Sequence, residues 1–423
     1  AYCPIGPDRD FTGRFFGLRK EDDKMVKGKW KRKLYFGGGQ LLSVLSKLIP
    51  KDSRRICFFC KSGLDDNSEA LFTYLKKRGY QKKYRIYCVV DHPDQYRQLE
   101  EENVFMISVK GCLWQLFRSR YLFCHGEMLA IMPTKKQISV NYWHGTPLKK
   151  INGMLDKLGN YRYDFFTYIT AAAPMFQPVF VQAFGCRQDQ VLLCGHPRND
   201  YLFQTEEGLK QLGIDSAEYE KIFLWMPTYR KSRDGYIQDT EESCEEIGGL
   251  PLFADVEELG ELNRFLERQN CLLILKMHPA QDLSRLNPKI RQYRRICFLT
   301  NEDMRRRQVP LYSLVKEADA LITDYSSVYF DYLLLDRPIG FVLEDLESYE
   351  GHRGFVVPNP LDYMPGEKIY CKEELLDFFR KVVNEEDNFK EERKKICDQV
   401  NYYQDGNNCA RLLELIHLEV DHS

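Results

Sequence analysis

The sequence has no excess of charge of either sign. Its 423 residues include 61 Lys and Arg and 62 Asp and Glu, which leaves a formal net charge of -1. Overall charge therefore gives no reason to expect nucleic-acid binding or attraction to a membrane, and charge has to be considered segment by segment. Hydrophobic residues make up 43% of the chain, enough to fill real cores, so general disorder is excluded.

The sequence also lacks a hydrophobic run suited to a membrane-spanning helix. The stretch from Phe165 to Cys186 carries no formal charge and is long enough to cross a bilayer. Pro174, Gln177 and Pro178 interrupt it, however, and such residues are unfavourable in a lipid-exposed helix. We therefore expect no transmembrane segment, and any membrane attachment has to be peripheral.

Metal-binding and nucleotide-binding motifs are missing as well. Cys57 and Cys60 have the spacing of a metal or redox pair, but no second pair at zinc-ribbon spacing follows. The 14 cysteines lie mainly in apolar runs, which predicts buried free thiols in a reducing compartment. No P-loop is present, and Gly37-Gly38-Gly39 is outside the context of a dinucleotide fingerprint. We therefore expect no binding site for ATP, NAD or a metal ion. Loose assistance of the reaction by Mg²⁺ is left open.

Residues 1–50 are predicted to form a basic appendage. The segment from Arg14 to Lys33 contains nine basic and three acidic residues, which gives a net charge of plus six. Aromatic residues lie among them. Such a mixture suits an anionic membrane surface. A solvated tail that keeps the protein soluble is the alternative.

The rest of the chain alternates short β-branched or aromatic runs with helix-length segments, which predicts parallel sheets built from βαβ units. The expected strands are 56–60, 84–90, 121–124 and 138–143 in a first series, then 222–226, 272–276, 296–299, 320–323 and 339–343 in a second. The expected helices include 67–78, 253–269, 311–318 and 326–336. We predict an α/β fold with two doubly wound, Rossmann-like domains at 51–202 and 203–385, followed by C-terminal helices at 386–423 that could return to the first domain.

Histidines occupy equivalent positions in the two series. In doubly wound sheets ligands bind beyond the carboxyl ends of the strands. His144 comes directly after one predicted strand and is followed by Gly145 and Thr146, while His278 follows the strand that ends at Lys276. One such histidine would more simply be a core or surface residue, but two at matching places favour a function.

Polar and basic residues follow other strands of the second series. Ser326 and Ser327 lie where a strand that ends in Thr323 and Asp324 passes into a helix, so this turn could bind an anion or merely cap the helix. Pro227, Thr228 and Arg230 follow an earlier strand. Together with Lys276 and Arg198, they would surround a phosphate group with fixed positive charge.

As a set, these motifs resemble those of the CDP-glycerol glycerophosphotransferases of teichoic acid and capsule synthesis. The segments that carry the resemblance, over residues 55–417, are KSGLDDNSEALFTYLKKRG, WHGTPLKK, GHPRND, MPTYR, KMHP, LITDYSSVYFDYLLLDRPIGF and DGNNCARLLELI. The resemblance implies a glycosyltransferase-B-like fold with two domains facing a central cleft, the first on the acceptor side and the second binding the CDP-linked donor. It further implies that His144 and His278 are essential, and that donor-contacting segments contain Arg198, Thr228, Arg230, Ser326 and Ser327.

The function that we expect is the transfer of glycerol phosphate or ribitol phosphate from a CDP-linked donor to a hydroxyl of a lipid-linked saccharide or polyol-phosphate polymer, with release of CMP. His144 would be the general base and His278 would stabilise charge, although these roles could be exchanged. The enzyme would act at the cytoplasmic face of the cell membrane as a peripheral protein, without nucleic acid as a partner.

Two alternatives stay open, and so does the polyol. Val356-Val357 follow Arg353-Gly354-Phe355 where the resembling family has an aromatic residue, so the sequence does not decide which polyol is transferred. A nucleotide-sugar glycosyltransferase of the same fold would attack an anomeric carbon instead of phosphorus. A non-catalytic partner would bind the polymer without turnover.

Overall fold

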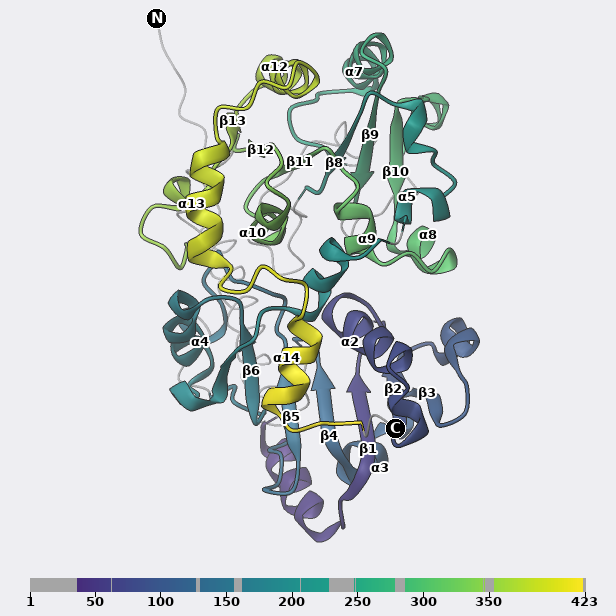
Figure 1. Cartoon of the computed structure of the whole chain (residues 1–423), viewed down its shortest axis with the longest axis vertical. Coiled ribbons are helices and arrows are strands. Elements are labelled where there is room, and N and C mark those ends of the chain that lie inside the picture. Colours follow the sequence, from purple (N-terminus) through teal and green to yellow (C-terminus); the bar gives the residue numbers. More distant parts are fainter. Residues whose placement is uncertain are drawn as a thin grey trace, which may run out of the picture.

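Two α/β lobes lie one above the other in the computed structural model (Figure 1). The structure describes residues 36–61, 63–126, 130–155, 162–205, 207–227, 247, 249–277, 286–344, 346 and 354–420. The lower lobe contains the earlier part of the chain and the upper lobe the later part, and the last helix lies on the lower lobe again (Figure 1).

The lower lobe is built on a parallel sheet with the strand order β3-β2-β1-β4-β5-β6-β7 among the described residues. Its strands are β1 (Asp52–Phe59), β2 (Arg85–Val90), β3 (Val104–Ser108), β4 (Ser119–Cys124), β5 (Ile138–Asn141), β6 (Tyr168–Ala171) and β7 (Val191–Leu193). Ile56, Cys57 and Phe58 in β1 are all fully buried, as expected of a central strand covered on both faces. The strand order reverses between β1 and β4, which makes the loops after these strands the place for a site.

The upper lobe repeats this plan with the order β10-β9-β8-β11-β12-β13 in the described part of the chain, again with parallel pairing. Its strands are β8 (Lys221–Trp225), β9 (Cys271–Lys276), β10 (Ile296–Leu299), β11 (Ala320–Thr323), β12 (Ile339–Val342) and β13 (Glu367–Ile369). Here the order reverses between β8 and β11, so the turn after Thr323 lies at a switch point.

Helices pack around both sheets. In chain order they are a helix over residues 36–48, then α2 (Asp66–Lys77), α3 (Cys112–Arg118), α4 (Gln177–Phe184), α5 (Gly208–Gln211), α7 (Val256–Arg268), α8 (Asn301–Arg306), α9 (Leu311–Val315), α10 (Val328–Tyr332), α12 (Lys372–Val383), α13 (Lys390–Val400) and α14 (Asn408–Leu415). Helix α7 shows how the sequence determines a helix. Asp255 accepts a hydrogen bond from the backbone of Glu258 at its start, and Leu259, Leu262 and Leu266 line one buried face.

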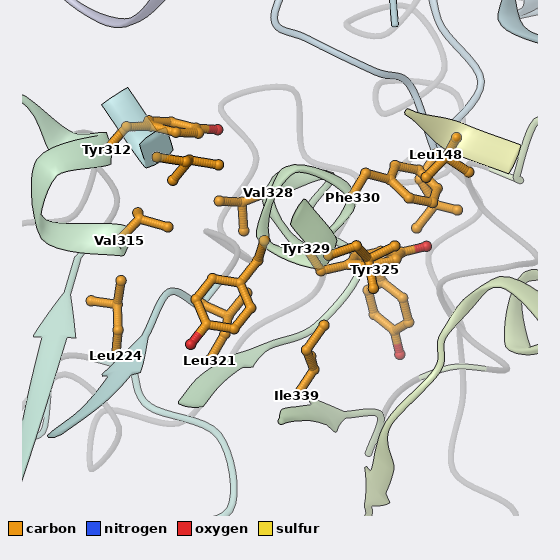
Figure 2. Packing of buried hydrophobic residues seen from close by; sticks show 14 of the residues in the cluster. Leu148, Leu224, Tyr312, Val315, Leu321, Tyr325, Val328, Tyr329, Phe330 and Ile339 are labelled. Carbon is orange, nitrogen blue, oxygen red and sulfur yellow. The ribbon is translucent and has the colours of Figure 1, made fainter. Parts of the chain in front are cut away.

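A continuous apolar core joins the lobes. Tyr325, Val328, Tyr329 and Phe330 surround the start of α10 in the upper lobe, and Leu148 from the lower lobe lies in the same cluster (Figure 2). The rings of Phe176 in the lower lobe and Phe330 also approach to 5.9 Å between centroids. The lobes are therefore packed against each other rather than linked only by a hinge.

The end of the chain returns to the lower lobe. In α14, Cys409, Leu412 and Leu413 belong to the apolar cluster that contains Ile56 of β1 (Figure 1). Asp200 accepts hydrogen bonds from the backbone nitrogens of Asn408 at 2.8 Å and Cys409 at 2.9 Å, and so holds the start of the helix. A helix from the last segment thus completes the core of the first lobe.

Arg198 forms a buried ionic joint between the lobes. It lies in the 3₁₀ helix η8 (Pro197–Phe203) with only 6% of its surface exposed. Its Nη1 donates to Asp66 Oδ1 at 2.8 Å, at the start of α2. Its Nη2 donates to Asp331 Oδ2 at 2.6 Å, on α10 of the upper lobe. The ring of Tyr312 lies 5.0 Å from the guanidinium, and its hydroxyl donates to Asp331 at 2.5 Å.

The predicted α/β class with two parallel sheets is confirmed, and every strand predicted above overlaps an observed one. Four strands of the structure were not predicted from the sequence: β3, β6, β7 and β13. The uncharged stretch 165–186 contains β6 and α4, and its rings are largely buried in the core. No helix within the described ranges has the length and apolar character needed to cross a membrane.

Replacing Arg198 by methionine should destabilise the protein strongly. The change keeps much of the side-chain volume but leaves the carboxylates of Asp66 and Asp331 buried without a counter-charge. We expect the free energy of unfolding to fall by about 3–5 kcal/mol, measured by urea denaturation followed by tryptophan fluorescence.

A matched control is Arg187→Met, since Arg187 pairs with Asp189 at 2.9 Å where both side chains are about 70% exposed. This variant should unfold like the wild type because exposed ion pairs contribute little. If the Arg198→Met and Arg187→Met variants had the same unfolding curve, the pairing of Arg198 with Asp66 and Asp331 would not stabilise the contact between the lobes.

Candidate active site

A strained turn after β5 places His144 at the surface. Trp143 has φ at 54°, which is uncommon for a bulky residue, and its backbone N–H donates to Asn141 Oδ1 at 2.8 Å. The indole packs edge-on against Phe184 at 5.1 Å and so helps to hold the turn. The next residue, His144, is consequently exposed although Tyr142 before it and Gly145 after it are buried.

Two glycines leave room for the groups around this turn. Gly145 has φ at 92°, and a Cβ there would lie 2.2 Å from Arg198 Nη2. Gly126 has φ at 68°, and a Cβ there would lie 2.5 Å from Nε2 of His144. Both positions therefore need glycine. The sequence predicts that Gly145 lets a ligand approach, whereas the structure brings Arg198 to this backbone.

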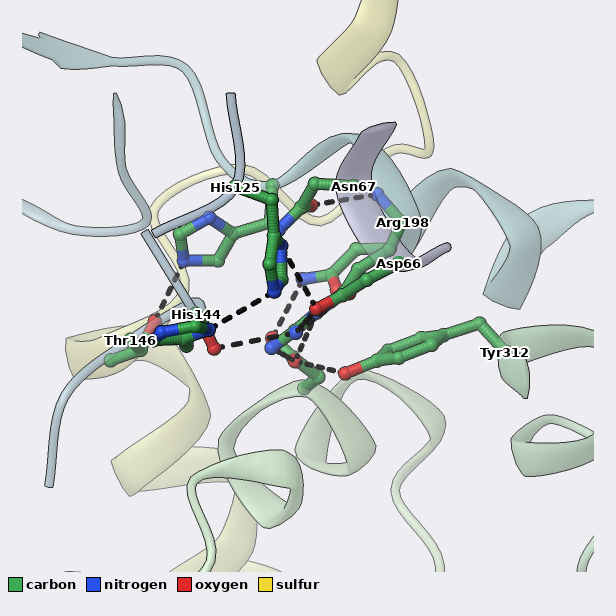
Figure 3. Close-up of polar contacts among 10 residues, drawn as sticks. Asp66, Asn67, His125, His144, Thr146, Arg198 and Tyr312 are labelled. Carbon is green, nitrogen blue, oxygen red and sulfur yellow. Dashed lines mark hydrogen bonds and ion pairs between the residues drawn. The ribbon is translucent and has the colours of Figure 1, made fainter. Parts of the chain in front are cut away.

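The side chain of His144 belongs to a polar chain that the lower lobe alone supplies. Its Nδ1 lies 3.0 Å from Nε2 of His125, the residue directly after β4. Nδ1 of His125 in turn lies 3.5 Å from Asp66 Oδ2. Figure 3 shows the ring of His125 between His144 and Asp66, with Arg198 beyond the carboxylate.

Burial and charge keep the two ends of this chain in defined protonation states. Although His144 reaches solvent, its ring is surrounded by protein atoms, and the resulting loss of hydration is the main cause that lowers its pKa to about 4. His125 and Arg198 lower the pKa further, while Asp66 opposes them. Burial raises the pKa of Asp66, but Arg198, His125 and His144 more than offset this, so the pKa stays below its ordinary value. At neutral pH the site therefore holds a neutral His144 and an ionised Asp66.

Thr146 and Arg198, which the sequence places in contact with substrate, have partners within the protein. Thr146 Oγ1 lies 3.1 Å from Nε2 of His196, and both residues are buried. Arg198 is held by Asp66 and Asp331 as described above. In this structure both side chains therefore have partners within the protein that stabilise the site.

In the upper lobe, Lys276 and Thr323 are likewise bonded internally. Lys276 is buried at the end of β9, where its Nζ donates to the carbonyl of Met277 at 3.1 Å and to Oδ1 of Asn301. Burial lowers its pKa to about 8, with Asp65 of the lower lobe and Asp303 opposing. Thr323 Oγ1 donates to the carbonyl of Met226 at 3.1 Å. These residues fix the ends of β9 and β11.

The turn after β11 presents two hydroxyls. Oδ1 of the buried Asp324 accepts from the backbone nitrogen of Ser326 at 3.2 Å, which shapes the turn. Ser326 and Ser327 are partly exposed, and no side chain among the described residues caps the start of α10. Pro227, two residues beyond β8, is partly exposed as well. Three further predicted residues, His278, Thr228 and Arg230, lie outside the described residues.

Comparison with known proteins adds the chemistry. The sequence model of a protein family described as CDP-Glycerol:Poly(glycerophosphate) glycerophosphotransferase matches residues 41–418. The chain belongs to this family. It is thus an enzyme, and the resemblance seen in its motifs is confirmed.

Members of this glycerophosphotransferase family with related sequences act in teichoic acid synthesis. The teichoic acid poly(glycerol phosphate) polymerase of Bacillus spizizenii is 27% identical over 87% of this chain and 93% of its own length. The teichoic acid ribitol-phosphate primase of the same organism is 26% identical over 78% of this chain and 82% of its own length. The solved structure of the wall teichoic acid polymerase TagF covers 95% of this chain and 97% of its own, with 21% identity and a TM-score of 0.69, which confirms the fold.

Several residues of this family member's site escaped the sequence analysis. His125-Gly126 follows β4 just as His144-Gly145 comes soon after β5. Because ligands bind beyond the carboxyl ends of the strands, this pair could have been predicted from the sequence. Asp66 and Asp331 carry no such signal, because their role depends on Arg198 from a distant segment. Among the described residues, no group of three or more His, Cys, Asp or Glu is arranged to hold a metal ion.

The protonation of His144 can be tested directly. We expect its ring to titrate near pH 4 in NMR spectra of histidine-labelled protein, well below the ordinary value of 6.5. The folded state then binds fewer protons than the unfolded state between these values, so this histidine lowers stability as the pH falls from 6.5 toward 4. The spectrum of His144→Ala assigns the signal. A midpoint at 6.5 or above would contradict the electrostatic description of the site.

Proposed function

We propose that this enzyme transfers glycerol phosphate or ribitol phosphate from a CDP-linked donor to a hydroxyl of a teichoic acid chain or its lipid-linked precursor, and that CMP leaves. The observation that carries the proposal is the exposed, neutral His144 at the end of β5 in a chain whose family is that of the glycerophosphotransferases. The names of its relatives include both glycerol-phosphate and ribitol-phosphate enzymes, so both polyols enter the proposal.

His144 is the general base in this proposal. Its Nε2 takes the proton of the acceptor hydroxyl while the hydroxyl oxygen attacks the β-phosphorus of the donor. The new P–O bond forms as the bond to the CMP oxygen breaks, and CMP leaves with that electron pair. The imidazolium then returns its proton to solvent. A pKa near 4 keeps the ring unprotonated at neutral pH, which makes it available for this step.

The upper lobe binds the donor in this proposal. Ser326 and Ser327 supply hydroxyls beside the switch point between β8 and β11, where doubly wound sheets bind ligands. In the sequence, Pro227, Thr228 and Arg230 follow β8, and His278 follows β9. Their fixed positive charge and hydrogen-bond donors would balance the charge that develops on the leaving CMP.

A backbone contact connects the late loop of the upper lobe with the segment that contains His144. Lys150 N donates to the carbonyl of Gly354 at 3.1 Å, and Val356 N donates to that of Leu148 at 2.9 Å. The loop that departs from the family pattern at Val356-Val357 is therefore fixed four to six residues after the base. This position supports a role for the loop in the choice of polyol.

Single alanine variants test the two histidines. His144→Ala and His278→Ala should each lower kcat for CMP release from CDP-glycerol or CDP-ribitol by about 10²- to 10⁴-fold, as expected for acid–base or charge-stabilising groups. His92→Ala is the control, since His92 is exposed and lies in another loop. Wild-type turnover in a folded His144 or His278 variant would remove that residue from the mechanism.

A panel of donors separates the alternatives. The wild-type enzyme should release CMP and form a phosphodiester product, identified by mass spectrometry. A product that contains a hexose from a UDP-sugar and no phosphodiester would favour a glycosyltransferase. CMP release at background with every donor and acceptor would favour a polymer-binding partner.

We also propose that the enzyme attaches peripherally to the cytoplasmic face of the membrane through its N-terminal segment. The helix over residues 36–48 buries Gly39, Ser43 and Ser46 against the lower lobe. Four of its large apolar side chains are exposed to solvent instead, with exposed fractions of 62% for Leu41, 55% for Val44, 43% for Leu45 and 77% for Leu48. This apolar stripe continues the basic segment Arg14–Lys33, whose own structure lies outside the described residues. Both features suit an anionic lipid surface.

The stripe can be removed without touching the site. In Leu41→Ser, Leu45→Ser and Leu48→Ser combined, co-sedimentation with vesicles of phosphatidylglycerol and phosphatidylcholine should fall several-fold, while kcat on a short soluble acceptor stays unchanged. Leu415→Ser makes the same change at an exposed leucine of α14 and should bind like the wild type. Binding should also weaken as salt rises, because screening reduces the electrostatic part. Unchanged binding of the triple variant would show that the stripe is no anchor.

A further inference from the structure

The imidazoles of His125 and His144 touch at the ends of two neighbouring strands. β4 and β5 pair in parallel, so the residues beyond their carboxyl ends lie side by side. The two rings are 4.7 Å apart between centroids and inclined at 78°, and Nδ1 of His144 faces Nε2 of His125 at 3.0 Å. A hydrogen bond of this length needs one nitrogen with a proton and one with a lone pair.

The surroundings of His125 decide which ring donates. Its Nδ1 is buried and has no hydrogen-bond partner in the described part of the chain, and the nearest charged group is Asp66 Oδ2 at 3.5 Å. A lone pair on this nitrogen would face a carboxylate and be repelled, whereas an N–H there is attracted. When His125 is neutral, its proton therefore lies on Nδ1, which leaves the lone pair on Nε2.

Asp66 is itself held firmly in the orientation that this argument needs. Nη1 of Arg198 donates to both of its carboxylate oxygens, at 2.8 and 2.9 Å. Arg198 is fixed in turn by Asp331. Because the pKa of Asp66 lies below its ordinary value, the carboxylate stays ionised at neutral pH.

We propose that His125 is a positioning residue that accepts a hydrogen bond from Nδ1–H of His144 and thereby leaves Nε2 of His144 free to take a proton. The proposal rests on the role of His144 as the base in the proposed function. Gly126 completes the arrangement, since it keeps any side chain away from the ring edge that carries Nε2 of His144. When Nε2 takes the proton of the acceptor, positive charge forms on His144. The Nδ1–H of this ring points to His125, and the carboxylate of Asp66 lies beyond it.

Two substitutions separate this role from simple packing. His125→Leu removes the acceptor and keeps an apolar side chain of fair size. His125→Gln keeps an oxygen that can accept from Nδ1 of His144 but cannot carry a proton onward. His92→Leu repeats the apolar change at an exposed histidine and serves as the control. Circular dichroism and urea unfolding establish that each variant is folded.

The readout is the tautomer of His144, from ¹⁵N NMR of histidine-labelled enzyme without substrate, together with kcat and KM for CMP release. In the wild type, His125→Gln and His92→Leu, the proton of His144 should reside on Nδ1. In His125→Leu it should move to Nε2, and kcat should fall by about 10²-fold or more while KM changes less than about threefold. His125→Gln should recover most of the lost turnover.

An unchanged tautomer and unchanged kcat in His125→Leu would overturn the inference. An equal loss of kcat in the leucine and glutamine variants, with the tautomer unchanged in both, would overturn it too, because the acceptor would then not be what matters. Absence of CMP release by the wild type with any donor is a different result. It would refute the proposed function, while the tautomer measurement would still test the hydrogen bond from His144 to His125.

Discussion

The buried ion pairs of Arg198 with Asp66 and Asp331 are the interaction on which the rest of the site depends. Taking three charges out of water is costly, and only close pairing with good hydrogen bonds offsets that cost. Each partner comes from a different part of the chain: the start of α2, the helix η8 between the sheets, and α10. The network therefore exists only when both lobes are folded and correctly packed.

This joint also sets the electrostatics of the lower lobe. Arg198 keeps Asp66 ionised, and at the same time it disfavours a proton on His144. A single guanidinium thus supports a carboxylate and a neutral imidazole a few ångströms apart. The positive charge of Arg198 is thus paired within the protein.

The sequence predicts the fold better than it predicts the site. Buried parallel strands such as Ile56–Cys60 are continuous apolar runs, so most of them can be located along the chain without a structure. Strand-end residues such as His144 follow from the same rule. The partners of Arg198 do not, because pairing across 132 and 133 residues depends on how the lobes pack. A basic residue in a motif can bind a phosphate or hold two lobes together, and only its neighbours in space decide which.

The same geometry connects the arrangement of the lobes to the base. Asp331 lies in the upper lobe and orients Arg198, Arg198 orients Asp66, and the carboxylate faces His125, which contacts His144 (Figure 3). A displacement of the upper lobe must either carry Arg198 with it or break its bond to Asp331. In the first case Asp66 loses its partner, and in the second a buried carboxylate is left without a counter-charge. Movement of Arg198 with the upper lobe would therefore disturb the polar chain behind His144, the residue that acts as the base in the proposed function.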